Sequence, residues 1–103
     1  MHTPQKRMYI LCRHDLSDKY GLIQGHHALA QYAIEHQGLF AEWGNHTIAV
    51  LGVRNLLELR EWNMTLQKKR KTFSMFREID LDGQETAIAC FDDGMIFEDL
   101  SSF

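Results

Sequence analysis

Alternation of apolar and polar segments predicts a strand followed by a helix at the start of the chain. Residues 7–13 are almost all apolar and predict a strand buried on both faces, in the middle of a covered sheet. From about residue 22 to residue 37, apolar residues recur with helical spacing, and Gly38 is a typical residue after a helix end. The residues expected to share the apolar face of this helix are Ile23, His27, Ala30 and Ile34.

The rest of the chain predicts one more helix and three more strands. A second apolar strand covers about residues 46–53, and Asn55 with Glu58 then resembles a capping box. The helix that follows has a periodic apolar stripe made of Leu56, Leu59, Trp62 and Leu66. Residues 72–78 predict a more polar and therefore more exposed strand, and residues 86–91 predict an apolar, central one.

The element order β-α-β-α-β-β predicts an α/β fold with a four-stranded mixed sheet flanked by helices. The length of 103 residues suits one domain, residues 1–103. Apolar residues in the tail after Asp92 indicate that it folds back onto the body. Right-handed crossovers would place the first β-α turn at the carboxyl ends of the parallel strands, which is the usual ligand position in α/β sheets.

Polar side chains concentrate around that end of the predicted sheet. The expected ligand-binding residues are Arg13, His14, Asp15, Lys19, Tyr20, Gln24, His27, Arg77, Glu78 and Thr86. A helix N-terminus close to an arginine and a lysine favours anion binding. Two of these residues have an alternative structural role: His27 as a core histidine bonded to a backbone carbonyl, and Asp15 as a cap of its own turn.

Composition excludes several functional classes. No run of about 18 apolar residues occurs, and the charged N-terminus is unlike a signal peptide, so we expect a cytoplasmic protein without a membrane partner. Cys12 and Cys90 lie within predicted strands and suit buried free thiols. Without Cys-x-x-Cys or histidines at i and i+4, we expect neither a metal nor a cofactor.

The charge distribution leaves one question open. The net charge of −3 argues against a dedicated nucleic-acid binder, but residues 68–71 read Lys-Lys-Arg-Lys. This block either complements the negative end of the second helix or contacts nucleic acid.

Aromatic residues are numerous for so small a core, so we expect a homo-oligomer, either a dimer or a tetramer. The aromatic residues that suggest this are Trp43, Trp62, Phe97 and Phe103.

Two parts of the chain resemble the type II peptidyl-tRNA hydrolase family, and specifically its short, divergent branch in phages and bacteria. The opening motif is Tyr9-Ile10-Leu11, Arg13, Asp15-Leu16 and Gln24-x-x-His27-Ala28. The closing motif is Phe76-Arg77-Glu78, Asp80 and Thr86-Ala87-Ile88-Ala89. The resemblance spans about residues 8–91 and implies that family's fold, with tRNA as the partner.

The resemblance also implies catalytic positions, one of which this sequence lacks. The family uses a lysine in the first β-α turn, an aspartate after the third strand and threonines leading into the fourth. Thr86 matches a threonine, and Asp80 or Glu78 stands near the aspartate position. Where the family places the lysine, Leu22 follows Gly21, and Lys19 is the local substitute in a different register.

Loss of a cation near the scissile ester would remove electrostatic stabilisation of the reaction. Our leading hypothesis is therefore a non-catalytic nucleotide-binding protein on the hydrolase-like scaffold. One form of it is a phage sponge that sequesters cyclic-dinucleotide immune signals in the host cytoplasm (anti-CBASS type). Phosphate would pair with Arg13, Lys19 or Arg77. The aromatic residues available to stack on a base are Tyr9, Tyr20, Trp43 and Phe76.

The alternative hypothesis is a peptidyl-tRNA hydrolase that cleaves the ester between peptide and tRNA. Lys19, Asp80 and Thr86 would then take the family's catalytic roles, and residues 68–71 would contact the tRNA backbone. A protein-interaction module without a small ligand is a third, simpler possibility.

Overall fold

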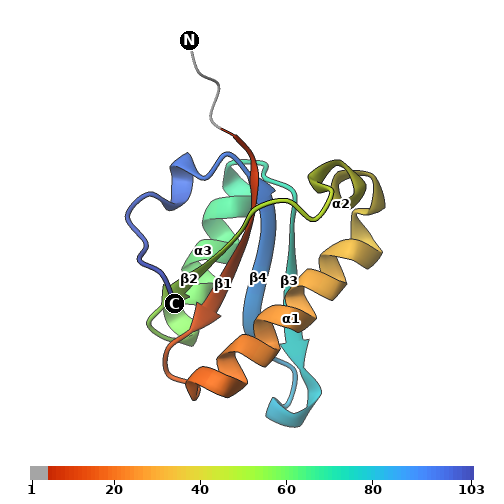
Figure 1. Cartoon of the computed structure of the whole chain (residues 1–103). Coiled ribbons are helices and arrows are strands. Elements are labelled where there is room, and N and C mark those ends of the chain that lie inside the picture. The colour runs from red at the N-terminus through yellow and green to blue at the C-terminus, as the bar shows by residue number, and fades with distance from the viewer. Residues whose placement is uncertain (1–4) are drawn as a thin grey trace.

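A four-stranded mixed sheet in the order β2-β1-β4-β3 forms the centre of the structure, a computed structural model that describes residues 5–103 (Figure 1). The strands are β1 (Arg7–Arg13), β2 (Ile48–Val53), β3 (Phe73–Glu78) and β4 (Gln84–Asp92). β1 runs parallel to β2 and antiparallel to β4, and β4 runs antiparallel to β3. The predicted α/β class with a mixed sheet is confirmed, as are the central positions of β1 and β4. The strand predicted to be more exposed, β3, lies at an edge of the sheet.

Helices cover both faces of this sheet. Helix α1 (Asp18–Glu35) and helix α2 (Gln37–Trp43) pack on one face, and α3 (Leu56–Lys68) packs on the other (Figure 1). Short 3₁₀ helices, η1 (Ile79–Leu81) and η2 (Met95–Phe97), precede β4 and follow it.

The predicted limits of the first helix were wrong at both ends. Helix α1 begins at Asp18 because Ser17 caps it, its hydroxyl accepting a hydrogen bond from the Tyr20 N–H. His36 has φ −134° and ψ 60°, which is outside the helical region and ends α1. Gly38 therefore lies inside the separate helix α2 instead of following the end of α1.

The expected buried face of α1 was also wrong. Ile23 is 43% exposed and Ile34 is 69% exposed. The residues that face the sheet are Gly21, Gln24, Gly25, Ala28 and Tyr32. A Cβ on Gly25 would lie 2.8 Å from the Cys12 sulfur, so only small side chains fit between this part of α1 and β1. Close packing selected the stripe of small residues over the more hydrophobic one.

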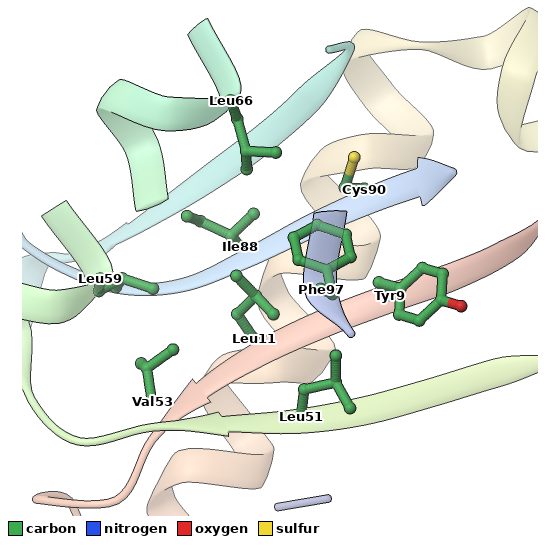
Figure 2. Packing of buried hydrophobic residues seen from close by; sticks show 9 residues of the cluster. All are labelled: Tyr9, Leu11, Leu51, Val53, Leu59, Leu66, Ile88, Cys90 and Phe97. Carbon is green, nitrogen blue, oxygen red and sulfur yellow. The ribbon is translucent and has the colours of Figure 1, made fainter. Parts of the chain in front are cut away.

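The hydrophobic core on the other face joins α3 to three strands (Figure 2). Leu59 and Leu66 of α3 point toward Leu11 of β1 and Ile88 of β4, all of which are fully buried. The predicted stripe of α3 is thus confirmed at Leu59 and Leu66. The predicted N-cap is confirmed as well, because the Asn55 side chain accepts a hydrogen bond from the Glu58 N–H at 3.0 Å.

The tail folds back along the outer edge of β2, as predicted. The Gly52 N–H donates to the Ser101 carbonyl at 2.9 Å, and the Phe103 N–H donates to the Val50 carbonyl at 2.9 Å. These bonds cover one part of an edge strand that would otherwise expose unpaired backbone groups.

The four aromatic residues that suggested an oligomer pack within one chain. Trp43 and Phe97 are buried, Trp62 packs against Phe97, and Phe103 packs against the core beneath α1. They therefore give no argument for a subunit interface. Both cysteines are buried and unpaired, as predicted. Within residues 5–103, no helix is both long and apolar enough to cross a membrane.

The close approach of α1 to β1 predicts an asymmetric effect of two glycine substitutions. Gly25→Ala should lower the free energy of unfolding by about 1–3 kcal/mol, because the new methyl group meets Cys12 and Ile10 at under 3.0 Å. Gly38→Ala is the matched control, since no atom lies within 4 Å of the position that its methyl group would take, and it should raise stability by up to about 1 kcal/mol. Urea unfolding of both variants measures this, and equal effects would contradict the packing argument.

Candidate functional site at the sheet end

The carboxyl ends of β1 and β3 lie next to the amino end of β4, at the same end of the sheet. Arg13 ends β1, Glu78 ends β3, and Gln84 begins β4. This is the sheet end at which the sequence predicted a ligand site. The polar side chains there form two groups, one on each face of the sheet.

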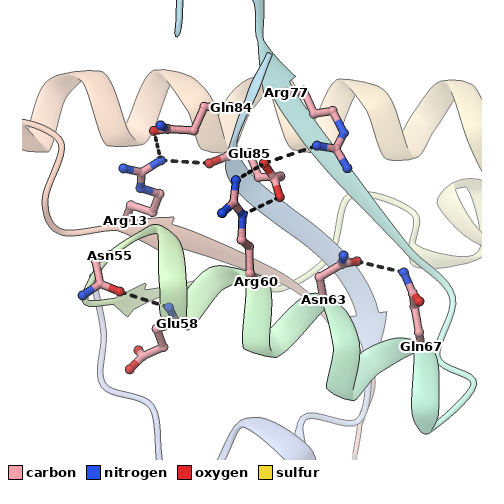
Figure 3. Close-up of polar contacts among 9 residues, drawn as sticks. All are labelled: Arg13, Asn55, Glu58, Arg60, Asn63, Gln67, Arg77, Gln84 and Glu85. Atoms are coloured by element: carbon pink, nitrogen blue, oxygen red, sulfur yellow. Dashed lines mark hydrogen bonds and ion pairs between the residues drawn. The ribbon is translucent and has the colours of Figure 1, made fainter. Parts of the chain in front are cut away.

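Arg13, at this end of the sheet, is only 4% exposed. Its Nε–H and Nη2–H donate to the two carboxylate oxygens of Asp15 at 2.9 and 2.6 Å. Its Nη1–H donates to Gln84 Oε1 at 2.6 Å and to the Glu85 carbonyl at 2.9 Å. The Arg13 guanidinium is therefore committed to protein partners. Asp15 connects it to the first β-α turn, and Gln84 and Glu85 connect it to the start of β4 (Figure 3).

On the α3 face, two arginines share the carboxylate of Glu85 (Figure 3). Arg60 Nε lies 2.9 Å from Glu85 Oε2, and Arg77 Nη1 lies 3.3 Å from Oε1. The Glu85 side chain is 10% exposed, whereas Arg60 and Arg77 are 53% and 59% exposed. One buried carboxylate thus holds two solvent-facing guanidinium groups close together, with a net local charge of +1.

The carboxylates of Glu85 and Asp15 are kept ionised by the arginines to which they are hydrogen-bonded. The hydrogen bond from Arg60 lowers the pKa of Glu85, with further contributions from the charges of Arg60 and Arg77. In the same way, the hydrogen bond from Arg13 lowers the pKa of Asp15. Both carboxylates are therefore ionised at neutral pH, and the arginine pair keeps its counter-charge.

On the α1 face, three polar side chains form a chain of hydrogen bonds. The fully buried hydroxyl of Thr86 donates to Gln24 Oε1 at 2.7 Å, and Gln24 Nε2–H donates to Glu78 Oε1 at 3.0 Å. Donation from Gln24 lowers the pKa of Glu78. These hydrogen bonds link β4, α1 and β3, and they leave the ionised carboxylate of Glu78 at the end of the edge strand β3.

Aromatic rings border that carboxylate. The ring of His27 stacks on Phe76 of β3, with centroids 4.5 Å apart and planes 11° apart. The pKa of Tyr20 is raised, first by partial removal from water and then by the charges of Glu78 and Asp80. The structural role considered for His27, a buried core histidine, was wrong: its ring is exposed because α1 turns this face to solvent.

The remaining predicted residues do not join either group. His14 stacks on Phe103 with centroids 4.8 Å apart, and its ring lies over Gly52 of β2. Lys19 is exposed in the first turn of α1 and has no ion-pair partner within residues 5–103. Asp80 is exposed in η1. In the basic block, Lys68 ends α3 and Lys71 pairs with Asp92 at 2.9 Å.

Arg60, Gln84 and Glu85 were missed by the sequence prediction. Arg60 lies within α3, which was assigned to core packing, and nothing in the local sequence connects it to Glu85, 25 positions later. Residues 80–85 are acidic in sequence, but their order does not show which of them turns toward α3. These contacts depend on tertiary structure.

A comparison with protein-family models and with curated proteins finds no match to this chain. Within the part of the chain that the structure describes, no group of three or more His, Cys, Asp or Glu side chains is placed to hold a metal ion. The site therefore has to be interpreted from its own geometry.

The Glu85 carboxylate predicts a pH-dependent contribution to stability. Because its pKa is lowered in the folded state, the contribution is fully present above about pH 5 and is lost as the pH falls through the folded pKa. Glu85→Gln should therefore lower the free energy of unfolding by about 1–2 kcal/mol at pH 7, discounted for the exposure of both arginines. At about pH 3 the difference from the wild type should shrink. Urea unfolding at both pH values checks this, and a constant difference would contradict it.

Proposed function

We propose that this protein is a non-catalytic nucleotide-binding protein whose phosphate contacts are made by Arg60 and Arg77. The observation that carries the proposal is the pair of half-exposed guanidinium groups held together by the buried Glu85 carboxylate. Guanidinium groups match phosphate in geometry and charge, and fixing them before binding reduces the entropy lost on association.

Of the residues expected to contact phosphate, Arg77 suits this role and Arg13 does not. Arg13 is buried and already makes four hydrogen bonds to protein groups. In contrast, the Arg77 side chain is 59% exposed and pairs with Glu85 through Nη1, so a ligand can reach this side chain from solvent. The cost of removing a bound phosphate from water is also smaller at this exposed rim than it would be beside Arg13.

The edge position of β3 lets one ligand reach both faces of the sheet. Successive residues of a strand point to opposite faces, and here Phe76 faces α1 while Arg77 faces α3. A nucleotide that wraps this edge would place its phosphate at Arg77 and its base near the His27–Phe76 stack. The ionised Glu78 carboxylate, next in the chain, would accept hydrogen bonds from amino groups of the base.

The proposal that the protein is not catalytic rests on the burial and hydrogen bonding of the three residues that would act as catalytic groups. The Thr86 hydroxyl is buried and bonded to Gln24, so it is not free to attack an ester. Lys19 and Asp80, the other two residues of the catalytic alternative, are exposed side chains outside the Thr86–Gln24–Glu78 chain of hydrogen bonds. The resemblance to type II peptidyl-tRNA hydrolases then concerns the scaffold, and cyclic dinucleotides are the first ligands to test.

Calorimetric titration with cyclic dinucleotides tests this function. We expect binding that weakens about tenfold or more in Arg77→Gln, because a charge-assisted phosphate contact is lost while the Arg60–Glu85 pair remains. Arg54→Gln is the matched control, since Arg54 pairs with Glu58 and is 79% exposed. If no cyclic dinucleotide or linear nucleotide gives heat at micromolar to millimolar concentration, the proposal fails.

Peptidyl-tRNA hydrolysis is the second candidate, favoured by one observation. Gln24, Glu78 and Thr86 carry the resemblance from distant parts of the sequence and meet in one hydrogen-bonded chain. We nevertheless expect no cleavage of the ester in charged tRNA above a heat-inactivated control. Turnover that the wild type shows and that Thr86→Val and Asp80→Asn lose would establish the hydrolase instead.

A further inference from the structure

A groove lies between α3 and the C-terminal tail, apart from the proposed nucleotide site. Its volume is about 280 Å³, and it is lined by Glu58, Glu61, Trp62, Thr65 and Leu100. Sites for whole small molecules usually measure about 300–1,000 Å³ and are more enclosed. A groove of this size and shape instead suits one or two side chains from a larger partner.

The lining of the groove combines an aromatic and aliphatic floor with two carboxylates, one of which, Glu58, is paired with Arg54 at 2.6 Å. The half-buried Trp62 packs against Phe97 with ring centroids 5.2 Å apart, which fixes the indole in place. Leu100 adds apolar surface from the tail. Glu61 is exposed and has no ion-pair partner within residues 5–103.

Exposed charged and apolar side chains also occur in the tail before Leu100 and elsewhere on α3. Glu98 and Asp99, both exposed, immediately precede Leu100 in the tail. Leu57 and Met64 of α3 are also exposed, at 67% and 69%. The tail therefore adds two exposed carboxylates next to Leu100, and α3 adds exposed apolar side chains together with the exposed cation of Lys68.

We propose that this groove docks a basic, amphipathic segment of a partner protein. A lysine or arginine of that segment would lie against the indole of Trp62 and pair with Glu61, as in cation–π recognition. An apolar neighbour in the segment would cover Leu100. The charge of the rim decides between occupants, because carboxylates beside an apolar floor attract cations and repel acidic or phosphorylated partners.

A short peptide of repeated Lys-Leu-Ala units is the probe for this surface. Its binding is followed through the indole N–H resonances of ¹⁵N-labelled protein. We expect the resonance of Trp62 to shift, while that of Trp43, which is 4% exposed and bonded to the Thr47 carbonyl, stays in place. The shift should weaken with added salt, and the same peptide with Glu for Lys should produce none.

Two charge-reversal variants distinguish peptide binding at this groove from unspecific attraction to the negatively charged protein. Glu61→Lys should weaken peptide binding about tenfold. Glu42→Lys is the matched control, because Glu42 is an exposed carboxylate on α2, which covers the other face of the sheet, and binding should be unchanged. Equal effects of the two reversals, binding of the acidic peptide, or a shift of Trp43 alone would each overturn the proposal. A Trp62 shift that depends on protein concentration without peptide would also overturn it, by showing that a second copy occupies the groove.

Discussion

The buried guanidinium of Arg13 organises the sheet end on which the proposed site depends. It donates to the turn after β1 through Asp15 and to the start of β4 through Gln84 and the Glu85 carbonyl. By fixing the backbone of Glu85, these bonds set the position of the carboxylate that holds Arg60 and Arg77. A cation this well buried is tolerated only because it is paired and hydrogen-bonded. The exposed arginine pair therefore owes its geometry to a side chain that no ligand needs to touch.

Close packing of α1 has an equivalent role on the opposite face. Because Gly25 lets the helix approach β1, Gln24 lies deep enough to accept from Thr86 and to donate to Glu78. The same approach turns the more hydrophobic stripe of α1, including Ile23, toward solvent. Helix position, and not hydrophobicity alone, thus decided which polar groups meet at the rim.

The sequence predicted where in the fold the candidate site lies, but not which of its side chains contact one another. The end of β1 and the Gln24 and Thr86 positions followed from the strand pattern and from the resemblance to type II peptidyl-tRNA hydrolases. Arg13 was expected to bind phosphate, whereas in the structure it is a buried connector. Arg60 was overlooked because a helix surface arginine is usually only solvated, and its partner is distant in sequence.

The sequence by itself determined the strands, the cap of α3 and the central place of β1, because period-two or continuous apolar patterns and capping residues act locally. Only the tertiary structure decided which face of α1 is buried, since that choice depends on the space between helix and sheet at Gly25. It also decided that Arg60 and Arg77 share Glu85, because long-range pairing is set by how α3 and β3 are placed on the sheet.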